Sequence, residues 1–211
     1  YRKMRSTMSA RTWTEQEDFW EGQFGNEYCE RNPLENLPVA MWADIIRRVG
    51  TANTFLELGA NIGRNLHAIR TLLPHSQLTA LEINAKAVET LRFSNIANVV
   101  HGSILDFVPE PNTWDLVFTS GVLIHLAPDF LGQAYDILYR ASSKYILVCE
   151  YYNPTPTEIS YRGNKGKLFK RDFAGEMLDK FSDLQIVDYK FVWHRDIFPA
   201  DDLTWFLMEK K

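Results

Sequence analysis

The segment TFLELGANIGRN, residues 54–65, joins a short apolar run to the start of a helical pattern. The run up to Leu58 predicts a buried strand, and apolar residues recur at helical spacing from Ile62 onward. Gly59 allows a tight turn between the two elements, and Gly63 allows the helix to pack close to the strand. The segment therefore predicts a strand–turn–helix unit with room for a ligand against the backbone of the turn.

The same alternation of strands and helices continues along the chain. Further strands are expected at residues 78–83, 98–102, 114–123, 144–152, 185–193 and 203–209. Most of them are separated by helical patterns, but the last two follow each other without a helix and are expected to pair antiparallel. We predict an α/β Rossmann-like fold, with a seven-stranded, mostly parallel sheet and an antiparallel edge hairpin. In such sheets, ligands bind beyond the carboxyl ends of the strands.

The composition of the 211 residues, 45% hydrophobic, suits one domain. We expect it over residues 11–211, after a disordered leader or cloning remnant at residues 1–10, with residues 11–37 as an N-terminal lid and residues 151–171 as a substrate loop. The 23 basic and 27 acidic residues leave a net charge of −4, which disfavours a nucleic-acid partner.

The sequence also bears on the compartment. It contains no apolar run near the ~20 residues of a membrane span and no secretory signal pattern. Its two cysteines are too few for a disulfide framework or a metal-ligand cluster. We expect a cytoplasmic protein without membrane attachment or a bound metal.

The turn after the first strand departs from the glycine pattern that binds a dinucleotide. In G-x-G-x-x-G, the second glycine admits a pyrophosphate and the third fits the helix against the sheet. Counted from Gly59, those places hold Asn61 and Arg64. Glu57, just before the turn, would repel a diphosphate but suits an ammonium or sulfonium group. The turn is therefore expected to bind a cationic ligand rather than NAD.

Residues at the next strand ends favour an adenosine. Glu82 ends the second strand and is placed to accept hydrogen bonds from both ribose hydroxyls, with Ile83 beside it. The third and fourth strands end in residues suited to the adenine edge and face and to the space around a sulfonium, namely Ser103, Ile104, Ser120 and Gly121. Together with Glu57, this set predicts an adenosine ligand that carries positive charge.

These motifs occur in a familiar order. With E-L-G-A-N-I-G-R-N, L-E-I-N and W-D-L-V-F-T-S-G-V-L-I-H-L, the chain from about Thr54 to Cys149 resembles class I S-adenosylmethionine-dependent methyltransferases. This resemblance implies S-adenosylmethionine as cofactor and transfer of its methyl group. The chain departs from the commoner loop of these enzymes at Ala60 and Asn61.

A longer pattern is similar to the pseudaminic acid biosynthesis-associated methylases. It runs from roughly Trp13 to Lys210 and includes F-W-E-G-Q-F-G-N-E-Y-C-E-R-N near the start and D-D-L-T-W-F-L-M-E-K at the end. This resemblance implies an acceptor that is a nonulosonic acid, a sialic-acid-like sugar of bacterial surfaces, or its precursor.

The lid and the substrate loop supply further candidates. In many methyltransferases the N-terminal segment folds over the cofactor, so Arg31 is expected to pair with the methionine carboxylate. Trp20 and Tyr28 would close the lid, although both also suit plain packing. Tyr151, Arg162, Lys165 and Arg171 are expected to bind the acceptor. The basic residues among them would form an anion pocket, or alternatively a solvated loop face.

His125 and His194 are the candidate general bases, because histidine titrates near neutrality. Glu150, Tyr151 or no base at all are the alternatives. The sequence leaves open which atom is methylated, whether the acceptor is nucleotide-linked, and the oligomeric state. It also leaves open a methyltransferase acting on RNA, protein or another metabolite, and a non-catalytic S-adenosylmethionine-binding protein.

Overall fold

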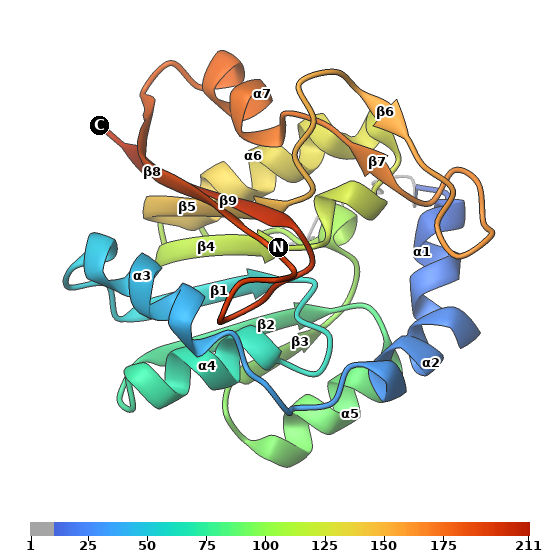
Figure 1. Cartoon of the computed structure of the whole chain (residues 1–211), viewed down its shortest axis with the longest axis horizontal. Helices are drawn as coiled ribbons and strands as arrows, with labels where there is room; N and C mark the ends of the chain where they lie inside the picture. The colour runs from blue at the N-terminus through green and yellow to red at the C-terminus, as the bar shows by residue number, and fades with distance from the viewer. Residues whose placement is uncertain (1–10) are drawn as a thin grey trace, which may run out of the picture.

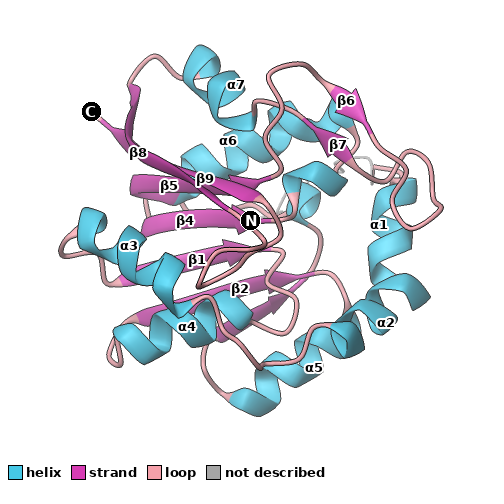
Figure 2. Ribbon diagram, in the orientation of Figure 1, coloured by secondary structure: helices cyan, strands magenta, loops and turns pink. Residues whose placement is uncertain are grey.

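The computed structural model describes residues 11–211, so the expected leader at residues 1–10 lies outside the described residues. Seven strands form one sheet in the order β3-β2-β1-β4-β5-β9-β8, with helices on both faces (Figures 1 and 2). Their bounds are β1 Thr54–Leu58, β2 Gln77–Glu82, β3 Asn98–His101, β4 Trp114–Ser120, β5 Ser142–Glu150, β8 Leu184–Val192 and β9 Leu203–Lys210.

The first five strands are parallel, and β9 is antiparallel to both of its neighbours. The predicted Rossmann-like sheet with an antiparallel hairpin at one edge is therefore confirmed. A separate two-stranded sheet, β6 (Thr157–Glu158) with β7 (Phe169–Lys170), lies within residues 151–171, the segment after β5 that was expected to be a substrate loop.

Two apolar cores, one on each face of the sheet, hold the layers together. Alternate residues of a strand enter opposite cores, as Phe55 and Leu56 of β1 do. One core receives α3 (Val39–Val49) and α4 (Arg64–Leu72), and the other receives α6 (Leu131–Ala141) and α7 (Phe173–Lys180). The helix α5 (Ala85–Ser94) follows β2 and packs against β3.

The N-terminal segment contains regular secondary structure. It forms two short helices, α1 (Glu15–Glu21) and α2 (Gln23–Arg31), the first of which begins with a capping box between Thr14 and Glu17. Both helices lie beyond the carboxyl ends of the parallel strands, and α2 packs against α5 (Figure 1). The segment is therefore positioned over the edge of the sheet where a ligand is expected.

The fourth strand is shorter than predicted. It ends at Ser120 because Gly121 adopts a positive φ of 67°, and the chain then makes a short 3₁₀ turn, η2 (Leu123–His125). A second 3₁₀ turn, η3 (Pro128–Phe130), leads into α6, close to the predicted helix start at Pro128. None of the helices in the described part of the chain is long and apolar enough to cross a membrane.

Candidate active site

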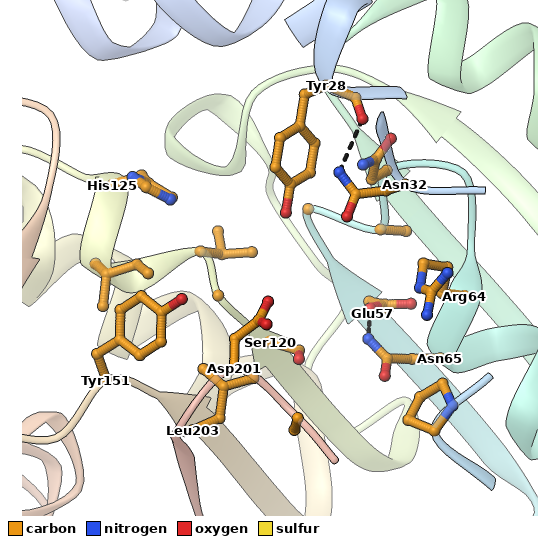
Figure 3. A pocket seen from close by; sticks show the side chains of 18 of the residues that line it. Tyr28, Asn32, Glu57, Arg64, Asn65, Ser120, His125, Tyr151, Asp201 and Leu203 are labelled. Carbon is orange, nitrogen blue, oxygen red and sulfur yellow. Dashed lines mark hydrogen bonds between the residues drawn. The ribbon is translucent and has the colours of Figure 1, made fainter. Parts of the chain in front are cut away.

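A cavity of about 1070 Å³ lies beyond the carboxyl ends of the parallel strands (Figure 3). Its base is formed by the ends of β1, β2 and β4 and by the turn after β3, and α1 and α2 cover it. Further parts of its wall come from the start of α3 and the segment before it, the residue after β5, the β6–β7 connection and the loop between β8 and β9. Because ligand pockets commonly measure about 300–1,000 Å³, this space accommodates a cofactor together with a small second molecule.

Glu57 lies buried at the end of β1, on the face that packs against α4. Its Oε1 accepts a hydrogen bond from Asn65 Nδ2 at 2.7 Å, whereas Oε2 is buried without a hydrogen-bond partner among the described residues. Burial raises the pKa of Glu57 to about 8, against the effect of the bond from Asn65. A cavity-lining carboxyl group with an unpartnered oxygen is suited to a cationic ligand group.

The turn after β1 requires glycine at two positions. Gly59 has φ +75°, and a Cβ there would lie 2.7 Å from Cγ2 of Val122. Gly63 has φ +83°, and a Cβ there would lie 2.5 Å from Cδ2 of Leu91. These close approaches let the turn pack against neighbouring elements while the backbone around Asn61 stays open to the cavity.

Glu82 joins the turns that follow β1 and β2. Its Oε2 accepts a hydrogen bond from the backbone N–H of Asn61 at 2.6 Å, and its Oε1 accepts one from Asn84 at 2.7 Å. Burial raises the pKa of Glu82, and these backbone bonds oppose the rise. Because each carboxylate oxygen has a second lone pair, the oriented side chain can still accept bonds from two adjacent ligand hydroxyls.

Ser103, after β3, lines the cavity but has protein partners. Its hydroxyl donates to Glu17 of α1, and its oxygen accepts a bond from the backbone N–H of Leu105 at 3.1 Å. Arg11 also binds Glu17 and pairs with Asp106 at 2.9 Å. Burial alone would raise the pKa of Glu17, but the bonds from Arg11 and Ser103 hold it at about 2.

The contact between Glu17 and Ser103 therefore fastens α1 to the turn after β3. It also engages the hydroxyl that was expected to meet the adenine edge, whereas the side chain expected at the adenine face, Ile104, lines the cavity. Sequence reasoning missed Glu17, although the T-x-x-E capping box that contains it is visible in the sequence.

Glu150, at the end of β5, holds the η2 turn in place. Its carboxylate accepts hydrogen bonds from the backbone N–H groups of Val122, Leu123 and Ile124 at 3.0–3.4 Å. Burial raises the pKa of Glu150 to about 7, and the backbone bonds oppose the rise. Both carboxylate oxygens of Glu150 are thus engaged by the turn that carries His125.

His125 presents one ring nitrogen to the cavity. Its Nδ1 lies 2.6 Å from the carbonyl oxygen of Lys167. Because a carbonyl only accepts hydrogen bonds, Nδ1 carries the proton of the neutral ring and Nε2 carries the lone pair. The ring packs against Trp20 and Tyr161, with centroids 4.6 and 4.9 Å away, and points into the cavity (Figure 3). Burial lowers the pKa of His125 to about 4.

His194 lines the same cavity from the loop between β8 and β9. Its Nδ1 lies 2.9 Å from both carboxylate oxygens of Asp202, and its side chain is about half exposed. The hydrogen bond from His194 lowers the pKa of Asp202. The two candidate bases therefore differ in environment, since His125 is buried among aromatic rings and His194 is paired with a carboxylate near solvent.

The lid residues expected at the site all line the cavity. Trp20 and Tyr28 pack edge to face with centroids 5.2 Å apart. Arg31 is paired with Glu27 at 3.3 Å and lies over the ring of Phe24. The guanidinium of Arg31 is therefore partly engaged by its own helix before any ligand binds.

The substrate candidates divide into two groups. Tyr151 and Arg162 line the cavity, as do Ile83, Ser120 and Gly121. Lys165 and Arg171 do not, and Arg171 pairs with Glu176 of α7 at 2.7 Å. The predicted anion pocket of three basic residues is therefore not assembled, and Arg162 is the member of that set which faces the cavity.

Two further cavity residues had no sequence prediction. Arg64 begins α4, and its guanidinium donates to the carbonyl groups of Glu35 and Asn36 at 2.9 Å each, which ties the segment before α3 to the turn after β1. Asp201 lies in the loop between β8 and β9, and its carboxylate points into the cavity (Figure 3).

Comparison with known proteins agrees with this architecture. Residues 56–141 match the family model described as a methyltransferase domain. A methyltransferase of Burkholderia thailandensis, crystallised with 1,6-didemethyltoxoflavin and S-adenosylhomocysteine, shares 15% identity at a TM-score of 0.67, over 93% of this chain and 87% of that one. No curated protein sequence matches the chain at a significant level.

Two more solved structures share the fold. A S-adenosylmethionine-dependent methyltransferase from Leishmania major has 18% identity and a TM-score of 0.68, over 94% of this chain and 87% of that one. Magnesium protoporphyrin IX methyltransferase from Synechocystis, with bound S-adenosylhomocysteine, has 11% identity and a TM-score of 0.66, over 92% of this chain and 98% of that one. Residues 56–141 are therefore a methyltransferase domain, and the chain as a whole has the fold of these S-adenosylmethionine-dependent enzymes.

The cavity fits this cofactor. The unpartnered oxygen of Glu57 suits the positive charge of its methionine part, and the oriented carboxylate of Glu82 suits a ribose diol. Gly121 has a positive φ, and apart from its two chain neighbours no residue has an atom within 4 Å of where its Cβ would be, which leaves open space at the end of β4.

Proposed function

We propose that this methyltransferase acts on a small anionic sugar, a nonulosonic acid of the pseudaminic type or its precursor. The observation that carries the proposal is the position of Arg162 in the cavity wall, because a guanidinium in a partly enclosed site favours a carboxylate or phosphate. The sequence resemblance from Trp13 to Lys210 supports the sugar class.

The enclosure of the cavity supports a small acceptor over a polymer. The helices α1 and α2 cover the site, and Glu17 fastens α1 to the turn after β3. A folded RNA or protein would have to displace this cover to reach the base of the cavity. The net charge of −4 also offers no broad attraction for a nucleic acid. Because the fold alone does not set the substrate, the acceptor requires a direct assay.

The proposed roles follow the geometry of the site. When bound, S-adenosylmethionine supplies an electrophilic methyl group on a sulfonium. Glu57 and the turn at Gly59 and Asn61 bind the methionine part, Glu82 the ribose, and Ile104 the adenine face. Nε2 of His125 accepts the proton of the acceptor's hydroxyl or amino group, and Tyr151 contacts the acceptor. Much of the rate then comes from holding two reactants in line. The two buried free cysteines, Cys29 and Cys149, fit a reducing cytoplasmic compartment.

The experiment is a mass-shift screen with methyl-labelled S-adenosylmethionine. N-acetylneuraminic acid serves as a nonulosonic acid probe, and bulk RNA and a mixed protein extract serve as polymer probes. The proposal expects a labelled methyl group on the sugar acid. Labelled RNA or protein together with an unmodified sugar acid would contradict it.

The chain offers a matched pair of variants for the anion. Arg162→Ala should raise the KM for the acceptor while the affinity for S-adenosylhomocysteine stays unchanged. Lys165→Ala removes a positive charge from the same loop at a position outside the cavity wall, so it should leave that KM unchanged. An equal effect of both variants would indicate general loop electrostatics rather than a specific contact.

A further inference from the structure

Sheet register brings one acidic side chain of the β8–β9 loop, Asp201, to the cavity. The strands β5 and β9 are antiparallel, and Glu150 at the end of β5 is paired with Thr204 near the start of β9. The chain just before β9 therefore reaches the same edge of the sheet as the chain just after β5. This register brings Asp201 close to Tyr151, although fifty positions separate them in the sequence.

The contacts of Asp201 agree with that placement. Its carboxylate points into the cavity between Tyr151 and Ser120, with the hydroxyl of Tyr28 directed toward the same space (Figure 3). Burial and the charge of Asp201 both raise the pKa of Tyr28, and they raise the pKa of Tyr151 to about 12. A lid helix, the end of β5 and the β8–β9 loop thus direct three oxygen-bearing side chains at one point.

Asp201 and its neighbour Asp202 differ in their ion pairs. Asp202 is engaged by His194 at 2.9 Å, whereas no lysine, arginine or histidine of residues 11–211 lies within ion-pair distance of Asp201. A carboxylate only accepts hydrogen bonds, and each of the two phenol hydroxyls beside it can accept one as well as donate one. Such a group favours a ligand that donates O–H or N–H bonds and disfavours an anion.

We propose that Asp201, together with the hydroxyls of Tyr28 and Tyr151, binds a hydroxyl or amino group of the acceptor and thereby sets which end of that molecule faces the methyl group. The inference rests on the proposed function and deepens it. Arg162 lies on the β6–β7 connection, which borders the cavity on a different side from the β8–β9 loop (Figure 1). The acceptor is therefore held at an acidic end by Arg162 and at a donor-bearing end by Asp201.

The test measures binding rather than turnover. N-acetylneuraminic acid and ethanolamine are titrated separately into the S-adenosylhomocysteine complex of the parent protein, of Asp201→Asn and of Asp129→Asn. The first probe carries hydroxyl donors and a carboxylate, and the second carries an ammonium without an acid. Asp129 is exposed on η3, away from the cavity, and is the charge-matched control.

We expect Asp201→Asn to weaken the probe that binds the parent by about 10- to 100-fold, the scale of a hydrogen bond to a charged group. The control should bind like the parent, and the affinities of all three proteins for S-adenosylmethionine and S-adenosylhomocysteine should agree within about twofold. If ethanolamine binds and the sugar acid does not, the sugar proposal fails while the role of Asp201 stands.

Three results would overturn the inference. The first is unchanged probe affinity in Asp201→Asn. The second is a loss confined to S-adenosylmethionine with S-adenosylhomocysteine unaffected, which would assign the carboxylate to the sulfonium charge. The third is that neither probe binds the parent complex at millimolar concentration.

Discussion

Both carboxylate oxygens of Glu150 accept from the backbone N–H of Val122, at 3.0 and 3.1 Å, and so fix the residue that begins the approach to the η2 turn carrying His125. In Glu150→Gln, an amide N–H₂ would face backbone N–H donors. We expect unfolding to become easier by about 1–3 kcal/mol and kcat to fall because the His125 ring loses its position. Denaturant unfolding and steady-state kinetics measure both effects. Glu110→Gln on the exposed surface is the control, and full activity of Glu150→Gln would refute this anchoring role.

Glu57 should make cofactor binding depend on pH. Its pKa in the free protein is raised to about 8, so the carboxyl group is mostly protonated at pH 6. A cationic ligand favours the ionised form, so binding should release a proton. Affinity for S-adenosylmethionine should rise from pH 6 to 7.5, by up to about tenfold per pH unit, the limit for one coupled proton. Calorimetry in buffers of different ionisation enthalpy measures the release. Glu57→Gln should bind more weakly with a flat profile, and an equally steep profile in this variant would assign the proton elsewhere.

The pH profile of catalysis separates the two candidate bases. His125 has a pKa lowered to about 4, so its Nε2 is available at all pH values above that. If His125 is the base, kcat/KM should stay level on the acid side until the pH approaches 4, and His125→Ala should lower kcat by about 10²–10⁴ without changing cofactor affinity. A variant with full kcat and the parent's profile would leave the ring a packing role and make His194→Ala the next test.

The lid should loosen when the charge of Glu17 is removed. The bonds from Arg11 and Ser103 favour the ionised carboxyl group, so their stabilising effect is present above the ordinary carboxyl pKa and is lost only as the pH falls toward 2. At neutral pH, Glu17→Gln removes the ion pair and should speed hydrogen exchange in α1 and α2. Glu21→Gln changes an exposed residue of the same helix and should not. Equal exchange in the two variants would argue against the fastening contact.

The sequence predicted the parts of the site that depend on local pattern. Glu57, Glu82 and Ser120 each end an apolar strand, and the ends of neighbouring parallel strands meet at one edge, so their convergence followed from strand order alone. Asp201 and Arg162 lie in loops whose course is set by packing elsewhere. The antiparallel pairing of β5 with β9 brings Asp201 to the cavity. The ion pair of Arg171 with Glu176 directs the side chain of Arg171 toward α7. The spacing of charged residues in the sequence of a loop does not show which of them will face the cavity.

We propose that the cavity beyond the strand ends binds S-adenosylmethionine and its product through Glu57 and Glu82. Calorimetric titration of S-adenosylhomocysteine and of NAD into the parent and into Glu82→Ala tests it most directly. We predict one tight site for S-adenosylhomocysteine, weakened in Glu82→Ala by ~1.5–3 kcal/mol because bonds to a charged acceptor are lost, and no binding of NAD. Tight NAD binding with no heat from S-adenosylhomocysteine, or equal affinity of the two proteins for S-adenosylhomocysteine, would contradict the account.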